Sequence, residues 1–317
     1  MYFKQIKKKS LIIIILIMVF YVSLTIISDI EKTANHFSNI KFEIIPLVLG
    51  IQFLSLILRG IRQKKLLDEI NVKLSFKENL KIYFAGISFI STPLGLGQVV
   101  KSQLIKELHG ISRSKTLPVI ILERFFDIFA ITMLVIFTII QFFSIQSAVI
   151  VLISLVIISI AYVILMKGNL GYITKKISKI SFLKKILPSD EIYESLHTSL
   201  KFKKMISSLG LSLVIWSIDA VGVYLAFLSF NIDINFIQSI QYYLTSLVYG
   251  TISFLPGGVG LTEGSLIAQL MTNGFDFSFA SSMTVFVRLT TIWFATILGL
   301  LVSSLFINKI SRKNDNE

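Results

Sequence analysis

The sequence predicts an all-α polytopic membrane protein. Hydrophobic residues make up 54% of the 317-residue chain, charged residues only 15%, and the mean hydropathy is +0.79. A helix of about 20 apolar residues crosses a bilayer. Apolar blocks that approach or exceed this length cover 11–27, 117–140, 148–166, 205–230 and 280–307. Because these blocks lack the period-two alternation of membrane strands, a β-barrel is excluded.

The basic residues predict which ends of the spans face the cytoplasm, where lysine and arginine collect. All 31 basic residues except Lys32, Lys41, Arg124 and Arg288 fall in segments that the predicted topology leaves inside. The topology has about six full spans, the second opening at Pro46, with both termini in the cytoplasm. The first span is predicted to be uncleaved, because no small-residue cleavage site follows it. We therefore expect a multi-pass protein of the cell membrane.

Composition also excludes several classes of function. The net charge of +13 is explained by the lysines and arginines of the predicted cytoplasmic segments. Because no soluble domain is predicted, nucleic-acid binding is not expected. The chain has no cysteine, and its three histidines are scattered, so no metal centre and no cofactor are predicted. No dinucleotide motif stands in a soluble βαβ unit, and no serine or cysteine lies beside a histidine. The chain is therefore not expected to be an enzyme.

Two apolar segments are broken by proline and glycine, and each arm is too short to span a bilayer alone. The breaks predict re-entrant helical hairpins over 82–108, entering from the cytoplasm, and over 242–271, entering from outside. Backbone outside a helix is tolerated at membrane depth only where protein or a wet cavity satisfies it. The break residues are Pro93, Gly95 and Gly97 in the first hairpin, and Pro256, Gly257, Gly258 and Gly260 in the second.

The two broken segments resemble each other. Aligning Pro93 with Pro256 also aligns two glycines and a serine, and a lone arginine follows 31 or 32 residues after each proline. Span, hairpin and span thus occur twice in opposite orientation, which predicts an inverted repeat; chance recurrence is the alternative. The predicted single membrane domain divides into 1–42 (first span and outer loop), 43–147 (first repeat), 148–204 (linking span and basic cytoplasmic loop), 205–307 (second repeat) and 308–317 (cytoplasmic tail).

Arg124 and Arg288 are the arginines that the topology places inside spans. An intramembrane charge costs at least ~2.5–3.5 kcal/mol at the bilayer centre, so it faces the protein interior and finds a partner. One interpretation is a buried ion pair that fixes helix packing, with Arg124 bound to Glu123, Asp127 or, across the halves, Glu263. The other makes the two arginines phosphate stations, one for each leaflet, since a guanidinium holds phosphate by two parallel bonds.

Other polar residues near the breaks have two interpretations each. Glu263 either caps the half-helix that follows the second break or forms a proton or cation site. Lys101, beside Gln98 on the returning arm of the first hairpin, either snorkels to the surface or meets an anionic headgroup. Asp219 is expected to bond to the facing hairpin. Arg59 and Arg62 are expected to snorkel to the inner surface.

Taken in order, these motifs resemble the membrane region of the lysylphosphatidylglycerol synthase/flippase family. The motifs are Pro93-Leu-Gly-Leu-Gly97-Gln-Val-Val-Lys101, Glu123-Arg124-Phe-Phe-Asp127, Pro256-Gly-Gly-Val-Gly260-Leu-Thr-Glu263 and Arg288. The resemblance implies a polytopic fold with re-entrant helices that moves charged lipids between leaflets. Gln98 and Lys101 depart from the family's common glutamate and arginine. The sequence ends at Glu317 without the soluble aminoacyl-transferase domain, so lysyl transfer is not implied.

We therefore predict a flippase for a phosphate-bearing lipid, either a phospholipid or another anionic or aminoacylated lipid. The expected partners are membrane lipids, a separate synthase or other envelope-lipid enzyme, and further copies of the chain. The alternative is a non-catalytic membrane subunit or scaffold for envelope-lipid or glycolipid synthesis. A small-solute or ion transporter is a third interpretation.

Overall fold

The computed structural model describes residues 19–90, 92, 96–166, 201–232, 234–253 and 255–314. Within these ranges the regular structure is helical and no β-strand is present, which confirms the predicted all-α class. Two of the predicted break residues, Pro93 and Gly95, lie outside the described residues. So do most of the predicted first span and the basic loop at 167–200.

The helices follow one another with short connections. They are α2 (Ile30–Ser38), α3 (Ile45–Glu69), α4 (Phe76–Ile87), α5 (Val100–His109), α6 (Arg113–Gln141), α7 (Ile145–Met166), α10 (Phe202–Ser229), α11 (Phe236–Ile252), α12 (Leu261–Thr272), α13 (Phe277–Arg288) and α14 (Phe294–Asn314). A π-helical turn, Leu289–Trp293, joins α13 to α14, so the predicted block 280–307 is one interrupted rod. Helix α2 lies in a stretch that the sequence predicted as a loop.

Four helical stretches in the described part of the chain are long and apolar enough to cross a membrane. They are Phe42–Glu69, Ile145–Val163, Lys203–Ser229 and Phe277–Ser304. This agrees with the predicted membrane protein and leaves the expected number of spans untested. The α6 helix is also long, but it carries the charged group Glu123-Arg124-Phe-Phe-Asp127 in its middle.

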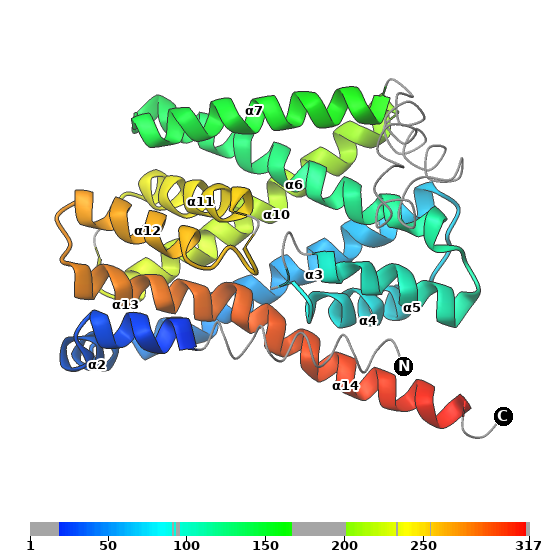
Figure 1. Cartoon of the computed structure of the whole chain (residues 1–317), viewed down its shortest axis with the longest axis horizontal. Coiled ribbons are helices and arrows are strands. Elements are labelled where there is room, and N and C mark those ends of the chain that lie inside the picture. Colours follow the sequence, from blue (N-terminus) through cyan, green and yellow to red (C-terminus); the bar gives the residue numbers. More distant parts are fainter. Residues whose placement is uncertain are drawn as a thin grey trace, which may run out of the picture.

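The helices run roughly side by side along the horizontal axis of Figure 1. The α3–α10 pair forms the centre, with α4 against α14 on one flank and α6, α7 and α11 on another. The helical pair α4–α5 has both of its connections to α3 and α6 at the right-hand end of the view. In the pair α11–α12, the start of α11 and the end of α12 lie on the left-hand side of the view. The two pairs therefore point toward the middle of the molecule from opposite ends.

Small residues let the central helices approach closely, as they do in membrane bundles. A Cβ added at Gly222 of α10 would lie 2.5 Å from the Gln52 amide of α3. One added at Gly299 of α14 would lie 2.5 Å from the backbone nitrogen of Ser88, just after α4. The glycines thus set the spacing of the bundle that holds the polar residues described below.

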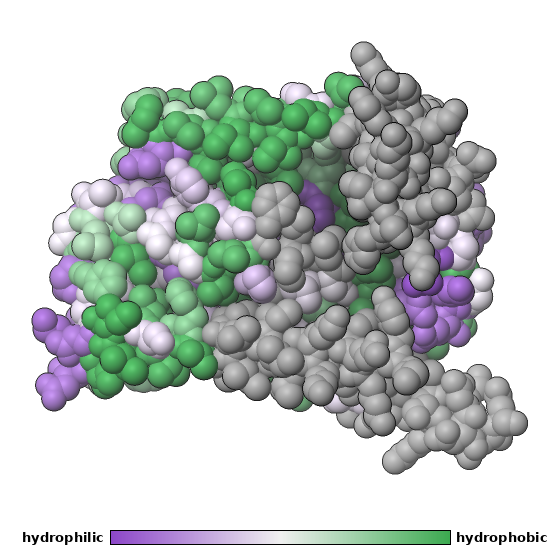
Figure 2. Space-filling view, in the orientation of Figure 1, coloured by the Kyte–Doolittle hydropathy of each residue, from purple (hydrophilic) through white to green (hydrophobic). Residues whose placement is uncertain are grey.

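The outer surface is mainly apolar. In Figure 2 hydrophobic residues cover the face formed by α7, and hydrophilic residues gather toward the left and right ends. The α7 side chains Leu152, Val156 and Ile160 are more than half exposed, at 65%, 56% and 55%. In water such a face would favour aggregation, whereas lipid tails cover it without cost. The surface therefore has the polarity pattern of a membrane protein.

The second predicted break is present. Helix α11 ends at Ile252 and α12 begins at Leu261, and between them Gly257, Gly258 and Gly260 adopt φ of 64°, 68° and 91°. L-residues rarely adopt this left-handed region, which explains the glycines. In the first hairpin, Gly97 is crowded by Phe89 and Thr92, and its backbone N–H donates to the Thr92 hydroxyl at 2.6 Å.

Candidate functional site

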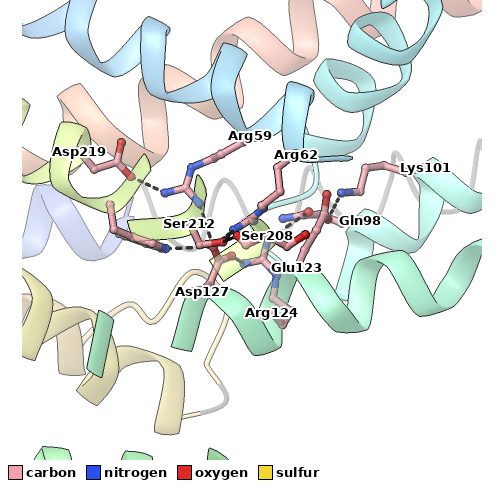
Figure 3. A network of polar contacts seen from close by, with 11 residues as sticks. Arg59, Arg62, Gln98, Lys101, Glu123, Arg124, Asp127, Ser208, Ser212 and Asp219 are labelled. Atoms are coloured by element: carbon pink, nitrogen blue, oxygen red, sulfur yellow. Dashed lines mark hydrogen bonds and ion pairs between the residues drawn. The ribbon is translucent and has the colours of Figure 1, made fainter. Parts of the chain in front are cut away.

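A polar cluster lies in the apolar bundle where α3, α5, α6 and α10 meet, and we call it the first cluster (Figure 3). It contains Arg59, Arg62, Gln98, Lys101, Glu123, Arg124, Asp127, Ser208, Ser212, Trp216 and Asp219. Three of its four cations, Arg59, Arg62 and Lys101, come from positions that the sequence predicted near the inner membrane surface. Arg124 was predicted within a span. The bilayer-like surroundings make every unpaired charge here costly.

Asp127 of α6 is the hub of this cluster. Its Oδ1 accepts a hydrogen bond from Arg62 Nη1 at 2.7 Å and another from the Trp216 indole at 2.9 Å. Arg62 is 1% exposed and also donates to the Ser212 hydroxyl at 2.8 Å. Because a buried carboxylate is stable only with such donors, Asp127 ties α3 and α10 to α6.

Arg59 lies one turn before Arg62 on the same face of α3. It forms an ion pair with Asp219 of α10, lies 3.5 Å from Asp127 Oδ1, and stacks 4.3 Å above the Trp216 ring. The expectations for these residues were wrong. Arg59 and Arg62 do not snorkel to the surface, and Asp219 bonds to α3 and not to a hairpin. Because the carboxylates of Asp127 and Asp219 face α3, burying the two arginines here costs less free energy than burying them unpaired would.

Lys101 joins the first hairpin to α6. Its Nζ donates to Glu123 Oε2 at 2.5 Å, and both side chains are at most 3% exposed. The lysine stem passes over Gly86 of α4, where an added Cβ would overlap Lys101 Cγ. Lys101 is therefore buried in an ion pair and does not snorkel to the surface, and Gly86 provides the space for it.

Arg124 is the cation of the cluster that faces outward. Its side chain is 39% exposed, whereas those of Arg62 and Lys101 are at most 3% exposed. Its Nη1 lies 3.6 Å from Asp127 Oδ2, which confirms the predicted pairing of residues three apart. Its Nη2 donates to the Gln98 amide oxygen at 3.3 Å, a long contact. Arg124 is thus held loosely and remains accessible.

The first cluster has an excess of positive charge and of unused polar atoms. Four cations, Arg59, Arg62, Lys101 and Arg124, face three carboxylates, Glu123, Asp127 and Asp219. Among the described residues, buried side-chain atoms without a hydrogen-bond partner include Arg62 Nε, Gln98 Nε2, Glu123 Oε1, Arg124 Nε, Asp127 Oδ2 and Ser208 Oγ. Buried polar groups are normally hydrogen-bonded, so this concentration indicates a place where a polar ligand or water binds.

A second, smaller cluster holds the tip of the α11–α12 hairpin. Arg288 of α13 pairs with Glu263 at 2.7 Å and donates to the Gly257 carbonyl, and both side chains are at most 3% exposed. The Tyr21 hydroxyl donates to Glu263 Oε1 at 2.6 Å. The other oxygen, Oε2, accepts from the Gly260 N–H at 2.7 Å, so Glu263 does cap α12. No side-chain atom of these residues is among the buried unpartnered atoms found in the described chain.

The structure thus separates the predicted site residues into two groups. Gln98, Lys101, Glu123, Arg124 and Asp127 lie together, whereas Glu263 and Arg288 form their own pair; Arg124 does not bind Glu263. Sequence reasoning missed Arg59, Arg62, Ser212, Trp216 and Asp219 as cluster members. One signal was present, since two arginines three residues apart share a helix face and the facing span carries a lone aspartate.

Comparison with known proteins gives consistent similarities. A family model described as the lysylphosphatidylglycerol synthase TM region matches residues 10–299. A UPF0104 membrane protein of Pyrococcus horikoshii is 27% identical over 300 residues, covering 86% of this chain and 90% of the relative. One of Methanothermobacter thermautotrophicus is 27% identical over 292 residues, covering 84% of each chain. One of Methanocaldococcus jannaschii is 24% identical over 331 residues, covering 96% of this chain and 97% of the relative.

Proposed function

The chain belongs to the family of the lysylphosphatidylglycerol synthase transmembrane region, and from this premise we propose that it is a lipid translocase. Its substrate is a lipid with a phosphate-bearing headgroup, moved between the leaflets of the cell membrane. In this proposal the chain acts as a transporter, in keeping with a match to a membrane region that covers residues 10–299.

The observation that carries this proposal is the accessible surplus cation of the first cluster. Arg124 is 39% exposed, and among the described residues it is held by the Asp127 oxygen at 3.6 Å and the Gln98 amide oxygen at 3.3 Å. Binding one phosphate would satisfy the excess charge, and the planar guanidinium suits two parallel bonds to phosphate oxygens. Arg124 is therefore the phosphate site of the proposed translocase, with Gln98 Nε2 as an adjoining donor.

Arg288 has a different role in this proposal. Its partners Glu263, Tyr21 and the Gly257 carbonyl already satisfy it, and it is 3% exposed. Of the two interpretations of the intramembrane arginines, the buried ion pair thus fits Arg288 and the phosphate station fits Arg124. Arg288 pins the second hairpin, and its release would let that hairpin move.

The inverted repeat and the re-entrant hairpins are part of the same proposal, within a single membrane domain with both termini in the cytoplasm. Reciprocal packing supports the repeat. In the proposed repeat α3, α4 and α5 correspond to α10, α11 and α12, and α6 corresponds to α13 and α14. The contact of α4 with α14 is then matched by that of α11 with α6, and the contact of α5 with α6 by that of α12 with α13. Helix α3 packs on its own counterpart, α10. These pairings are the ones that a two-fold relation between 43–147 and 205–307 requires. The opposite directions of the two hairpins in Figure 1 also agree with it.

In the proposed mechanism the headgroup enters the bundle while the acyl chains stay in lipid. The phosphate binds Arg124. The hairpins then rock about their glycine breaks and expose the bound phosphate to the opposite side of the membrane. Gly257, Gly258 and Gly260 supply the backbone freedom for this motion in the second hairpin.

Flux of a headgroup-labelled phospholipid in proteoliposomes tests the proposal. Arg124→Gln should reduce the initial rate at least about tenfold, the value of one lost charged hydrogen bond. Arg113→Gln, which removes an exposed arginine from the same helix, is the matched control and should leave the rate unchanged. Wild-type protein that moves no lipid, but copurifies with a lipid-synthesis enzyme, would instead support the scaffold alternative.

A further inference from the structure

A groove lies at the end of the α3–α10 seam, next to the first cluster. Its volume is about 700 Å³, and its lining residues come from the last turns of α3, the α3–α4 connection, the first residue of α4 and the start of α10. The lining cations are Lys64, Lys65 and Lys204, and the lining acids are Asp68 and Glu69. Lys64 is paired with Asp68 at 2.8 Å, so two lysines, Lys65 and Lys204, and one acid, Glu69, remain among the described lining residues.

The groove also has an apolar side. Ile61 and Phe76 line it and are 37% and 47% exposed. A pocket that places ammonium groups beside exposed apolar side chains matches a ligand with an anionic head and an apolar tail. Free inorganic phosphate would use the lysines but would gain nothing from Ile61 and Phe76.

A line of cations connects this groove to the first cluster. Lys65, Arg62 and Arg59 follow one another at intervals of three residues, or about 4.5 Å, along α3. Each reaches α10, where Lys65 Nζ donates to the Ser207 hydroxyl at 2.6 Å, Arg62 donates to the Ser212 hydroxyl and Arg59 pairs with Asp219. The seam between the two central helices is therefore polar and cationic from the groove inward.

Among the described residues of this seam, buried polar atoms without a hydrogen-bond partner include one from each helix. They are Arg62 Nε and Ser208 Oγ; the residues are 1% and 0% exposed. Figure 3 shows Ser208 in the same polar network as Arg62, Glu123, Arg124 and Asp127. A donor and a hydroxyl left unused along a cationic seam indicate a path on which an anionic group exchanges partners.

We infer that this groove is the loading site for the lipid headgroup on the side where α3 ends, and that Lys65, Arg62 and Arg59 guide the phosphate to Arg124. The inference rests on the proposed function and adds to it the point where the substrate is captured. Lys65 and Lys204 bind the phosphate first, and Ile61 and Phe76 contact the adjoining apolar chain. The phosphate then passes Ser208 to reach Arg124.

Trp216 offers a direct readout of this path, because its indole bonds to Asp127 and its ring lies under Arg59. The chain has two tryptophans, so Trp293→Phe leaves Trp216 as the sole reporter. The full-length protein in detergent is titrated with dihexanoyl phosphatidylglycerol while Trp216 fluorescence is followed. The double variant Lys65→Gln, Lys204→Gln should raise the half-saturating concentration of the phospholipid about tenfold. Lys73→Gln, exposed and outside the groove, should not change it.

Inorganic phosphate and a neutral dihexanoyl glycerol identify the source of the signal. Both should need concentrations at least about tenfold higher than the phospholipid, since each lacks one half of the ligand. Equal affinity for free phosphate would overturn the lipid assignment. An unchanged titration in the double lysine variant, with lipid flux retained in wild-type proteoliposomes, would overturn the groove and leave the proposed function standing. If the protein without the lysine substitutions showed neither a fluorescence response to the phospholipid nor lipid flux, the proposed function itself would be overturned.

Discussion

The proposed repeat gives Arg124 and Arg288 matching places, yet the surroundings of these two arginines differ. Arg124 is 39% exposed in a cluster with one cation too many, whereas the Arg288 side chain is 3% exposed and lies in a neutral, saturated cluster. The first cluster leaves polar atoms without partners, and the second does not within the described chain. The difference shows that similar sequence patterns can lie in different chemical surroundings. In the proposed function this difference corresponds to ligand binding at Arg124 and to pinning of a hairpin at Arg288.

The largest effect on stability is expected for Arg288→Ala. Breaking a fully buried ion pair leaves Glu263 charged and unpaired, which costs ~3–5 kcal/mol. The free energy of unfolding, measured by circular dichroism in mixed micelles with increasing dodecyl sulfate, checks this. Arg288→Met combined with Glu263→Gln should recover most of the loss, because no uncompensated charge remains and the new amide oxygen can still accept from the Gly260 N–H. A loss below about 1 kcal/mol for Arg288→Ala would contradict the assigned pinning role.

Gly86→Ala should have the next largest effect and tests the interior of the first cluster. The new Cβ would displace the Lys101 stem and separate Lys101 from Glu123, at a cost of ~2–3 kcal/mol for a buried charged bond. The same unfolding titration measures it. Gly50→Ala is the matched control, since a Cβ at that helical glycine meets nothing within 4 Å. Equal stability of the two variants would argue against a tight Lys101–Glu123 pair.

Gly260→Ala isolates backbone strain at the second hairpin. A Cβ at this position meets no atom within 4 Å, so the φ of 91° is the only source of the effect. Holding alanine in a left-handed conformation costs roughly 1–2 kcal/mol. Gly264→Ala, also without a neighbour for its Cβ but inside α12, is the control and should be neutral or slightly stabilising. Identical unfolding curves for both variants would show that the break does not need its glycine.

The smallest effect on stability is expected for Arg124→Gln. The side chain is 39% exposed and its ion pair is long, so its removal should change the free energy of unfolding by less than ~1 kcal/mol. Unfolding in mixed micelles, run beside the flux assay, separates stability from transport. A stability loss as large as that of Arg288→Ala would remove the distinction between the clusters.

The all-α class and most helix positions follow from the sequence because long apolar blocks and proline–glycine breaks are local signals. The second break shows this well, since Gly257, Gly258 and Gly260 do adopt positive φ. The cap from Glu263 to Gly260 was among the predicted alternatives for the same reason. Both depend on residues within one turn of each other.

The partners of the charged residues did not follow from the sequence. Arg59 and Arg62 end an apolar block, and the positive-inside pattern assigns such residues to the surface. They turn inward because Asp219 and Asp127, on helices distant in sequence, lie opposite them. The pairing of Arg288 with Tyr21 likewise joins residues 267 apart. Long-range pairing of this kind depends on tertiary packing, which one sequence does not specify.

Arginine-specific labelling with phenylglyoxal, read residue by residue by mass spectrometry, tests the difference between the two clusters most directly. The protein is labelled in detergent with and without added phosphatidylglycerol. Arg124 should react without the lipid and be protected by it, while Arg288 should stay unreactive in both conditions. Labelling of Arg288 that the lipid suppresses, with Arg124 unaffected, would contradict the assignment of the phosphate to the first cluster.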